Sequence, residues 1–322
     1  GFDIGYYHTS TVNQYFRVPV STTIVASGEA GLNAGDIVNK GIEASIFVKP
    51  FQSEDFSWTT TLNFSSNKNE ILSISDSNVQ GLIPTDFFTI SAKGVNTFGS
   101  YLVEGGSFGD IYAQVVKRDA NGIAIVDNGA VIAEDSNLVD GLTKVGNANP
   151  DFNLGWNNSF TYKNFTLDFL IDGKFGGETV SMTEAIVEGF SNNSARETAN
   201  GSVAVVDLAG VASTLTAQEY YGKVGGRNGF TGEYVYSATN VRLAEFAIGY
   251  NFDLSKDSFF KRVKTSLVGS NLFFFYKDAP HDPNLSLSTG NALQGVDVLG
   301  LPSSRSVGLN ITSKGQIQSE II

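Results

Sequence analysis

The feature that most constrains this chain is an alternation of apolar and polar residues with a period of two. Between Phe56 and Phe64, one set of alternate residues reads Phe-Trp-Thr-Leu-Phe, and the intervening set reads Ser-Thr-Thr-Asn. Successive side chains of a strand point to opposite faces of the sheet, so this segment predicts one apolar and one uncharged polar face. Similar alternation recurs at 42–48, 152–162, 165–171, 244–252 and 306–311. We expect an all-β chain with about nine or ten strands, each near the roughly 9–11 residues that cross a bilayer at a tilt.

The connections between these strands fall into two length classes that alternate. Lys163-Asn164 and residues 50–55 are short, whereas 72–100, 104–150 and 178–233 are long. Short periplasmic turns and long extracellular loops are typical of outer-membrane barrels, and a soluble sandwich seldom carries several such loops. The pattern predicts an antiparallel transmembrane β-barrel with long extracellular loops. Within the last long loop, Met182 to Phe190 is expected to be helical.

Aromatic residues gather at the predicted strand ends, where they are expected to contact outer-membrane lipid. Clusters occur at 6–7, 51–56, 162–165, 250–252 and 273–276. Amphipathic rings favour the headgroup level of a bilayer, so these clusters predict aromatic girdles. The alternative is the core of a soluble sheet. The uncharged Ser, Thr and Asn face favours girdles, because it suits a watery lumen.

Composition excludes several classes of function. The chain has no cysteine, which excludes disulfides, thiolate metal sites and a Cys nucleophile. Its two histidines, His8 and His281, make a multi-His zinc site improbable. The net charge of −12 comes without a basic stripe, which argues against a nucleic-acid partner. There is no apolar run long enough for a membrane-spanning helix. The chain opens in strand rhythm at Phe2 without a signal peptide, which predicts a mature chain or a fragment of an exported protein.

No catalytic, cofactor or metal site is predicted, and we do not expect an enzyme. There is no nucleophile elbow. The acidic pairs Glu134-Asp135 and Asp278 with Asp282 match no EF-hand spacing, which favours solvated acids over a calcium site. His281-Asp282-Pro283 is interpreted as loop structure rather than a ligand contact. The glycine-rich run 222–229 lacks the strand-to-helix context of a phosphate cradle and is interpreted as a flexible loop tip.

Two sets of residues leave alternatives open, and no ligand-binding residue is assigned. Arg242 and Glu245 are either charges that line a lumen and fix register, or a simple exposed pair. Aromatic residues of the long loops either stack on sugars or peptides, or pack the loops onto one another; these are Phe87, Phe88, Tyr101, Phe108 and Tyr112.

A series of short motifs resembles one family of transporters. Residues 33–43, Asn-Ala-Gly-Asp-Ile-Val-Asn-Lys-Gly-Ile-Glu, are similar to a signature of the SusC/RagA-type TonB-dependent transporters. Further resemblances follow in the family's order at 149–165, 172–177, 241–252, 270–274, 282–284 and 302–308. Two departures stand out. Residues 282–284 read Asp-Pro-Asn where the family has Asp-Pro-Glu, and the chain continues through 314–322 where the family ends on an aromatic residue.

This resemblance implies that the chain is the C-terminal portion of a larger barrel. Residues 1–313 would supply about the last ten strands of a wall of about 22 strands, and residues 314–322 would form a tail. It also implies active import of an oligosaccharide or a peptide across the bacterial outer membrane. TonB would deliver the energy through a part absent from this chain, and a SusD-like surface lipoprotein would be the partner. The alternatives are a passive porin or structural barrel, and a secreted all-β glycan-binding module.

Overall fold

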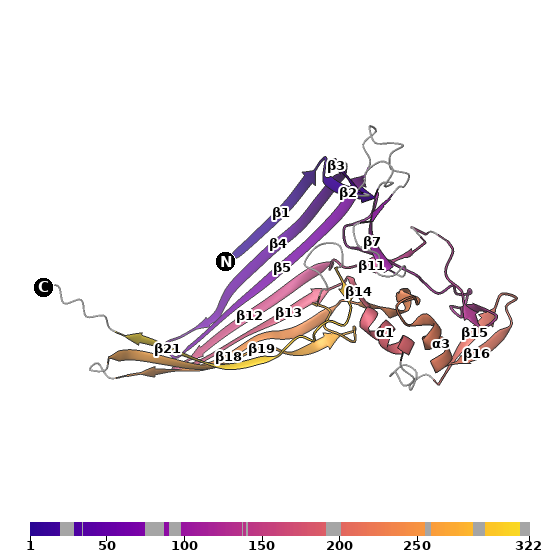
Figure 1. The fold of residues 1–322 in the computed structure, drawn as a ribbon. Helices are drawn as coiled ribbons and strands as arrows, with labels where there is room; N and C mark the ends of the chain where they lie inside the picture. Colours follow the sequence, from indigo (N-terminus) through magenta and orange to yellow (C-terminus); the bar gives the residue numbers. More distant parts are fainter. Residues whose placement is uncertain are drawn as a thin grey trace.

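The computed structural model describes residues 1–19, 29–33, 35–74, 87–89, 98–136, 138–139, 141–190, 201–254, 259–285 and 294–315. Its main body is one antiparallel sheet, which we call the wall (Figure 1). In spatial order, the wall consists of β1 (Phe2–Thr11), β4 (Asp36–Gln52), β5 (Phe56–Ser73), β12 (Phe152–Tyr162), β13 (Phe165–Phe175), β18 (Asn240–Asp253), β19 (Phe260–Lys277) and β21 (Ser306–Gly315). The described residues thus give the wall eight strands, against the nine or ten expected.

Strand register confirms the two faces that the alternation predicts. Leu62 of β5 lies opposite Ile46 of β4 and Trp156 of β12, so apolar residues meet apolar residues across the sheet. The next residue, Asn63, lies between Ser45 and Gly155 on the other face. Large side chains of the apolar face stay exposed, among them those of Phe2, Ile4, Ile46, Leu62, Phe165, Ile248, Leu267 and Ile311. Such a face needs a lipid surrounding, which the predicted barrel provides.

Aromatic rings stack side by side near the turn end of the apolar face. Trp58 stacks on Phe51 at a centroid distance of 6.1 Å and on Phe160 at 5.5 Å. Phe160 in turn stacks on Phe169 at 6.1 Å, so the rings bridge four neighbouring strands. This row is the arrangement expected of an interfacial girdle.

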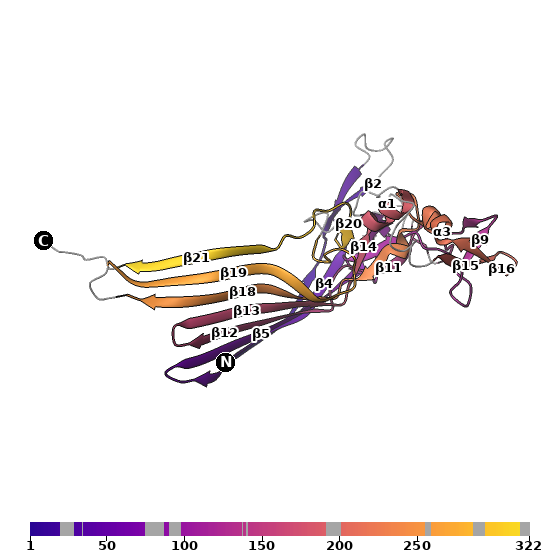
Figure 2. The same cartoon turned by 90° about the horizontal axis from the view of Figure 1, so that it is seen from below.

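Long and short connections lie at opposite ends of the wall, as predicted (Figures 1 and 2). Lys163, with φ of 51°, and Asn164 form the tight β12–β13 turn. The other predicted turn, 50–55, is shorter than expected, because β4 continues to Gln52. Pro50 falls in a bulge between Val48 and Phe51, where a residue without an N–H does not break the ladder.

The long connections fold into a loop layer of small sheets and helices at one end of the wall (Figure 1). The predicted helix is present as α1 (Met182–Phe190), and a second helix, α3, spans Ala217–Val224. The short strands are β2 (Tyr15–Pro19), β3 (Glu29–Asn33), β6 (Phe87–Thr89), β7 (Phe98–Val103), β8 (Asp110–Ala113), β9 (Ala124–Asp127), β10 (Ala130–Val131), β11 (Thr143–Asn147), β14 (Glu178–Ser181), β15 (Ser202–Asp207), β16 (Ala212–Thr216), β17 (Val235–Ser237) and β20 (Val296–Asp297), with a 3-10 turn at Thr231–Tyr234.

Most buried apolar side chains belong to this layer rather than to the wall. One core cluster centres on Ile111, Val180 and Tyr234, and a second on Val116, Val205 and Val224. A capping box fixes the start of α3, in which the Thr216 hydroxyl accepts from the Glu219 N–H and the Glu219 carboxylate accepts from the Thr216 N–H. No helix among the described residues combines the length and hydropathy needed to cross a membrane.

The prediction of a flexible loop tip at 222–229 is wrong. Residues 222–224 are the end of α3, and Gly225 and Gly229 are buried. A Cβ on Gly225 would lie 2.7 Å from the backbone N of Gly189 in α1, so the glycines allow two helices to approach closely. The run follows the C-terminal end of α3, and this end of a helix repels anions.

The predicted boundary between barrel and tail at residue 313 shifts slightly. β21 continues to Gly315 and pairs with β19 along its length, so the first two residues of the predicted tail lie in the wall. The remainder, 316–322, lies outside the described residues.

Candidate cargo-binding site

A cavity lined by carboxamides opens on the polar face where the wall meets the loop layer. Asn39 of β4 and Asn67 and Asn69 of β5 occupy alternate positions that share this face. The cavity measures about 320 Å³, and its remaining lining residues are Thr11, Gln14, Ile37, Phe108, Asn149 and Gln294. We call this cavity the amide pocket. Because the polar face is the lumen side of the barrel, the pocket lies at the extracellular mouth of the lumen.

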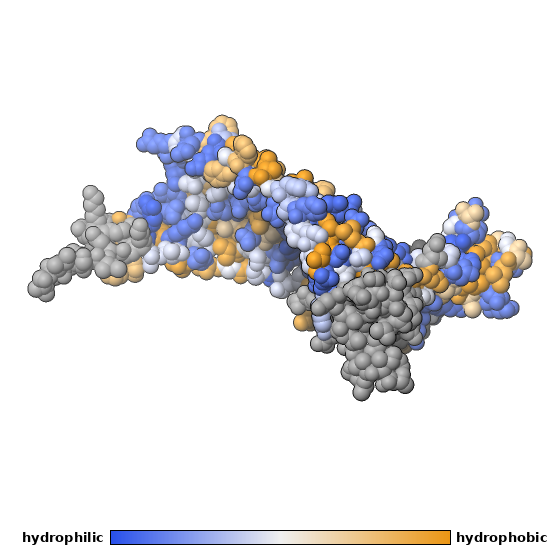
Figure 3. Space-filling view, turned by 90° about the horizontal axis from the view of Figure 1, so that it is seen from above, coloured by the Kyte–Doolittle hydropathy of each residue, from blue (hydrophilic) through white to orange (hydrophobic). Residues whose placement is uncertain are grey.

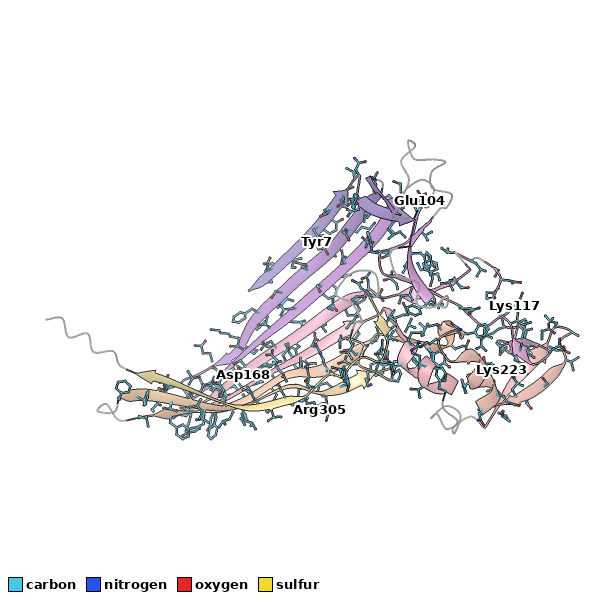
Figure 4. The ribbon with its side chains drawn as sticks, in the orientation of Figure 1. Tyr7, Glu104, Lys117, Asp168, Lys223 and Arg305 are labelled. Carbon is cyan, nitrogen blue, oxygen red and sulfur yellow. The ribbon has the colours of Figure 1, made fainter. Side chains whose placement is uncertain are left out.

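Hydrogen bonds hold the amides of the pocket in defined orientations. The Tyr7 hydroxyl donates to Asn67 Oδ1 at 2.9 Å, and Asn69 Nδ2 donates to Asn39 Oδ1 at 3.0 Å. Figure 4 shows Tyr7 on β1 of the wall. Asn69 Oδ1 also accepts from the backbone N–H of Phe108 at 3.0 Å, which ties the wall to the loop layer. A carboxamide offers donors and acceptors together, so this lining suits a neutral partner that carries hydroxyl or amide groups.

A larger cleft of about 680 Å³ lies beside the amide pocket and shares Asn67, Asn69 and Asn149 with it. Charged side chains of both signs line this cleft, namely Lys68, Glu70, Asp110, Lys144, Asp151 and Glu178. The mixed charges distinguish it from the amide pocket, whose lining carries no ionisable group. The two cavities therefore offer different chemistry to a ligand at the same end of the wall.

Asp110, which lines the larger cleft, is buried, with 1% of its surface exposed. Its carboxylate accepts from Lys144 Nζ at 2.7 Å, from Asn147 Nδ2 at 2.7 Å and from the Ser107 N–H at 3.0 Å. Three donors, one of them charged, offset the cost of burying a carboxylate. Burial and the nearby Asp110 charge raise the pKa of Tyr112 to about 12. Nothing in the sequence pattern around Asp110 indicates this role.

The structure favours the first alternative for Arg242 and Glu245, because both lie on the polar face of the wall. Arg242 pairs with Asp172, its direct neighbour on β13, through Nε at 3.1 Å and Nη2 at 3.0 Å. Its Nη1 also donates to Asn271 at 3.3 Å. A bulge between Leu243 and Glu245 restores Glu245 to the same polar face. The lumen therefore carries an ion pair that links neighbouring strands, with Asp172 rather than Glu245 as the partner of Arg242.

Two of the loop aromatics take the packing role. Tyr101 and Tyr112 are buried and pack edge to face at 5.4 Å beside Leu142, so they hold the loops together. Phe108 is half-buried and contributes to the lining of the amide pocket. Phe87 and Phe88 lie in β6, and their side chains fall outside the described set.

The acidic residues singled out above have protein partners. Asp135 pairs with Lys117 at 2.7 Å, and Glu134 accepts from the Ser136 hydroxyl at 2.8 Å. Asp282 accepts from the Asn284 N–H at 2.9 Å, which fixes the turn after His281 as predicted. Within the part of the chain that the structure describes, no three His, Asp or Glu side chains gather as metal ligands.

His281 connects the loop between β19 and β21 to β14. Its Nε2 lies 3.0 Å from the Thr179 hydroxyl, which itself donates to the Gly295 carbonyl at 3.0 Å. Because a hydroxyl has a single hydrogen, Nε2 donates and the neutral ring leaves Nδ1 unprotonated. Nδ1 is buried without a partner among the described residues. Burial lowers the pKa of His281 below its ordinary value of 6.5, and Lys277 adds to this shift, whereas Asp297, Asp282 and Glu184 oppose it.

This geometry predicts that low pH weakens the contact between β14 and the loop that contains His281. A histidine kept neutral in the folded state stabilises that state above the unfolded pKa of about 6.5, and the contribution is lost as the pH falls through the lower folded pKa. Amide hydrogen exchange in 278–285 and 294–297 is therefore expected to be faster at pH 5.5 than at pH 7.5, after correction for intrinsic rates. The His281→Gln variant keeps a donor to Thr179 but has no side chain that titrates in this range. Its corrected exchange rates should therefore be the same at both pH values. An equal acid response in both proteins would contradict this assignment.

Comparisons with known proteins agree with the barrel wall. No family model matches the chain. TonB-dependent receptor P3 of Formosa agariphila is 27% identical over 333 residues, covering 95% of this chain and 32% of that protein. TonB-dependent receptor SusC of Bacteroides thetaiotaomicron is 24% identical, covering 88% of this chain and 29% of that protein. The chain thus spans about a third of the length of the curated relatives it matches.

Solved structures show the same fold at low sequence identity. The RagAB peptide transporter aligns with a TM-score of 0.64 and 15% identity, covering 97% of this chain and 33% of that chain. The RagAB peptide importer in its closed-closed state gives a TM-score of 0.62 with the same coverage. In sequence and in fold, the chain is therefore an outer-membrane β-barrel segment similar to the TonB-dependent receptors of the SusC type.

Proposed function

We propose that the complete protein imports a neutral oligosaccharide or peptide actively across the outer membrane, and that the amide pocket holds part of the cargo. The position of the pocket carries this proposal. It opens on the polar lumen face, at the end of the wall where the long loops fold. A cargo bound there stands at the entrance of the pathway that the barrel encloses.

The lining of the pocket favours an uncharged, hydrogen-bonding segment of cargo. Asn39, Asn67 and Asn69 present oriented amides, and Phe108 supplies an aromatic ring beside them. Amides bind sugar hydroxyls and peptide groups alike. An adjacent aromatic ring favours a sugar face, so we rank an oligosaccharide above a peptide. The solved RagAB structures are named as a peptide importer, which keeps the peptide as the second candidate.

The energy source and the partner of the complete protein belong to the same proposal. Relatives named TonB-dependent receptors support delivery of energy by TonB through a part outside this chain. The resemblance to SusC supports a SusD-like lipoprotein on the cell surface. The broad exposed apolar face of the wall disfavours the alternative of a secreted, soluble glycan-binding module.

Active import and a passive porin differ in their dependence on TonB. Cells that produce the complete protein are expected to accumulate a labelled oligosaccharide or peptide on which the source organism grows. Removal of TonB should abolish this uptake. Uptake that continues without TonB would establish the porin. Accumulation of neither cargo class would remove the import proposal altogether.

Substitutions in the amide pocket test whether it binds cargo. Asn67→Ala and Phe108→Ala are each expected to weaken cargo binding about five- to tenfold, in line with about 1 kcal/mol for a hydrogen bond or a ring contact. The matched control is Asn63→Ala, which lies on the same face of β5 but outside the pocket. Binding to detergent-purified protein can be measured by calorimetry. An equal loss in the control, or no loss in either pocket variant, would refute the assignment.

A further inference from the structure

The outermost part of the loop layer is a small four-stranded sheet with an open edge. Its strands lie in the order β10-β9-β15-β16, and α3 packs against it (Figures 1 and 2). β10 is only two residues long, and such short edge strands resist further pairing. β16 forms the other edge with five residues. Among the described residues, no strand pairs with its free side.

In the part of the chain that the structure describes, β16 lacks the charges, prolines and bulges that usually protect an edge strand. Its sequence, Ala-Ser-Thr-Leu-Thr, contains no charge and no proline. Its register with β15 runs from Ser202↔Thr216 to Val206↔Ala212 without a bulge. Folded proteins normally block an accessible edge by charges, proline, bulges or coverage, because an unprotected edge recruits another strand. A chain with 33 acidic residues places none of them on this edge.

The hairpin turn defines which backbone groups of β16 face outward. The Asp207 N–H donates to the Val211 carbonyl at 3.0 Å. Hydrogen-bonded pairs alternate along an antiparallel ladder, so Val205↔Ser213 is the next bonded pair. Ala212 and Thr214 therefore direct their N–H and C=O groups away from β15. Both residues are exposed.

The turn beside this edge is held by hydrogen bonds and exposes aliphatic side chains. The Asp207 carboxylate accepts from the N–H groups of Ala209 at 2.9 Å and Val211 at 2.8 Å. The side chains of Leu208 and Val211 are 67% and 61% exposed. Figure 3 shows hydrophobic residues gathered at this outer end of the molecule. A fixed turn with exposed aliphatic groups loses little conformational entropy on binding, which favours a role in contacts with another protein.

We propose that β16 accepts an extended strand from a partner polypeptide on the cell surface. An extended chain is the partner that this edge fits, because it supplies donors and acceptors at the two-residue spacing of Ala212 and Thr214. Leu215 is only partly buried on the α3 side of the sheet, so the added strand places an apolar residue over it. This proposal rests on the proposed function, under which the strand donor is the surface lipoprotein.

A pair of substitutions at Thr214 separates strand pairing from side-chain effects. Thr214→Pro removes the outward N–H but spares the ladder with β15, whereas Thr214→Val retains the N–H. In the complete protein purified with its lipoprotein, the proline variant is expected to retain about tenfold less partner than the valine variant, which corresponds to about 1.4 kcal/mol. Heat-modified gel mobility verifies that both barrels are folded. Equal retention of the partner in both variants would overturn the proposal.

Photocrosslinking tests the same contact without proline. A benzophenone amino acid at Ala212 in the complete protein, in whole cells, is expected to form an adduct with the lipoprotein. An adduct only with a second receptor copy or with peptide cargo, or no adduct, would overturn the proposal. TonB-dependent uptake is measured in the same cells. Normal uptake without a lipoprotein adduct would refute the strand proposal alone. Absence of TonB-dependent uptake in cells with the unsubstituted protein would refute the proposed function.

Discussion

Replacing Leu62 with arginine is expected to prevent most of the protein from assembling in the outer membrane, whereas arginine at the next residue, Asn63, should be tolerated. Leu62 lies near the middle of the apolar face, between Ile46 and Trp156. An arginine on the lipid side of a barrel costs about 2–4 kcal/mol at the membrane midplane. Asn63 faces the lumen, where water solvates the charge. The adjacent positions share strand, depth and chain context, and they differ in the face to which they point.

The measurement is the folded fraction in outer-membrane preparations, read from heat-modifiable gel mobility of the complete protein. We expect at least about a tenfold smaller folded fraction for Leu62→Arg than for Asn63→Arg, since about 1.4 kcal/mol corresponds to a factor of ten. If both variants assemble equally well, or if Asn63→Arg is the more damaging, the assignment of the two faces is wrong.

Removing the Asp110 carboxylate is the second change with a large expected effect. Asp110→Ala leaves Lys144, Asn147 and the Ser107 N–H without their shared acceptor. Loss of several buried hydrogen bonds, one of them to a charged donor, is expected to destabilise the loop layer around Asp110 by about 3 kcal/mol. The wall contains no part of this network, so the barrel should remain folded while the loop layer opens.

Limited proteolysis of purified barrels detects this local opening. Cleavage within the described loop residues 98–151 is expected to accelerate at least tenfold in Asp110→Ala. Asp127→Ala provides the control, because Asp127 is exposed in the same loop layer. Equal cleavage rates in the two variants would show that Asp110 does not hold the layer together.

The faces of the wall were predictable because most of its strands are regular. In β5, successive residues point alternately to the lipid side and to the lumen side, and the residue types alternate in the same way. β18 shows the limit of that logic. Ala244 was expected on the apolar face, but the bulge beside it places Leu243 opposite Ile171 instead. An alternating pattern does not reveal a bulge when the extra residue is alanine, because this small residue is accepted on either face of a strand.

The loop layer was not predictable because its order depends on distant pairing. β14 contains four residues and pairs with β20, so that Val180 lies opposite Val296. Neither segment has a pattern long enough to indicate a strand. The amide pocket left a weak signal in advance, since Asn67 and Asn69 occupy alternate positions of one strand face. Asn149, Phe108 and Gln294 come from other connections, and only the fold brings them to this place.

Hydrogen bonds to the Gly295 carbonyl join two loops that lie far apart in the sequence. The Val180 N–H donates to the Gly295 carbonyl at 2.7 Å, and Thr179 donates to the same oxygen. Gln294, one residue earlier, lines the amide pocket, and Val180 leads within two residues into α1. We therefore expect a displacement of Gln294 to reach the start of α1 and the glycine contact between α1 and α3. The pocket, the start of α1 and the outermost hairpin are thereby joined by one continuous series of contacts.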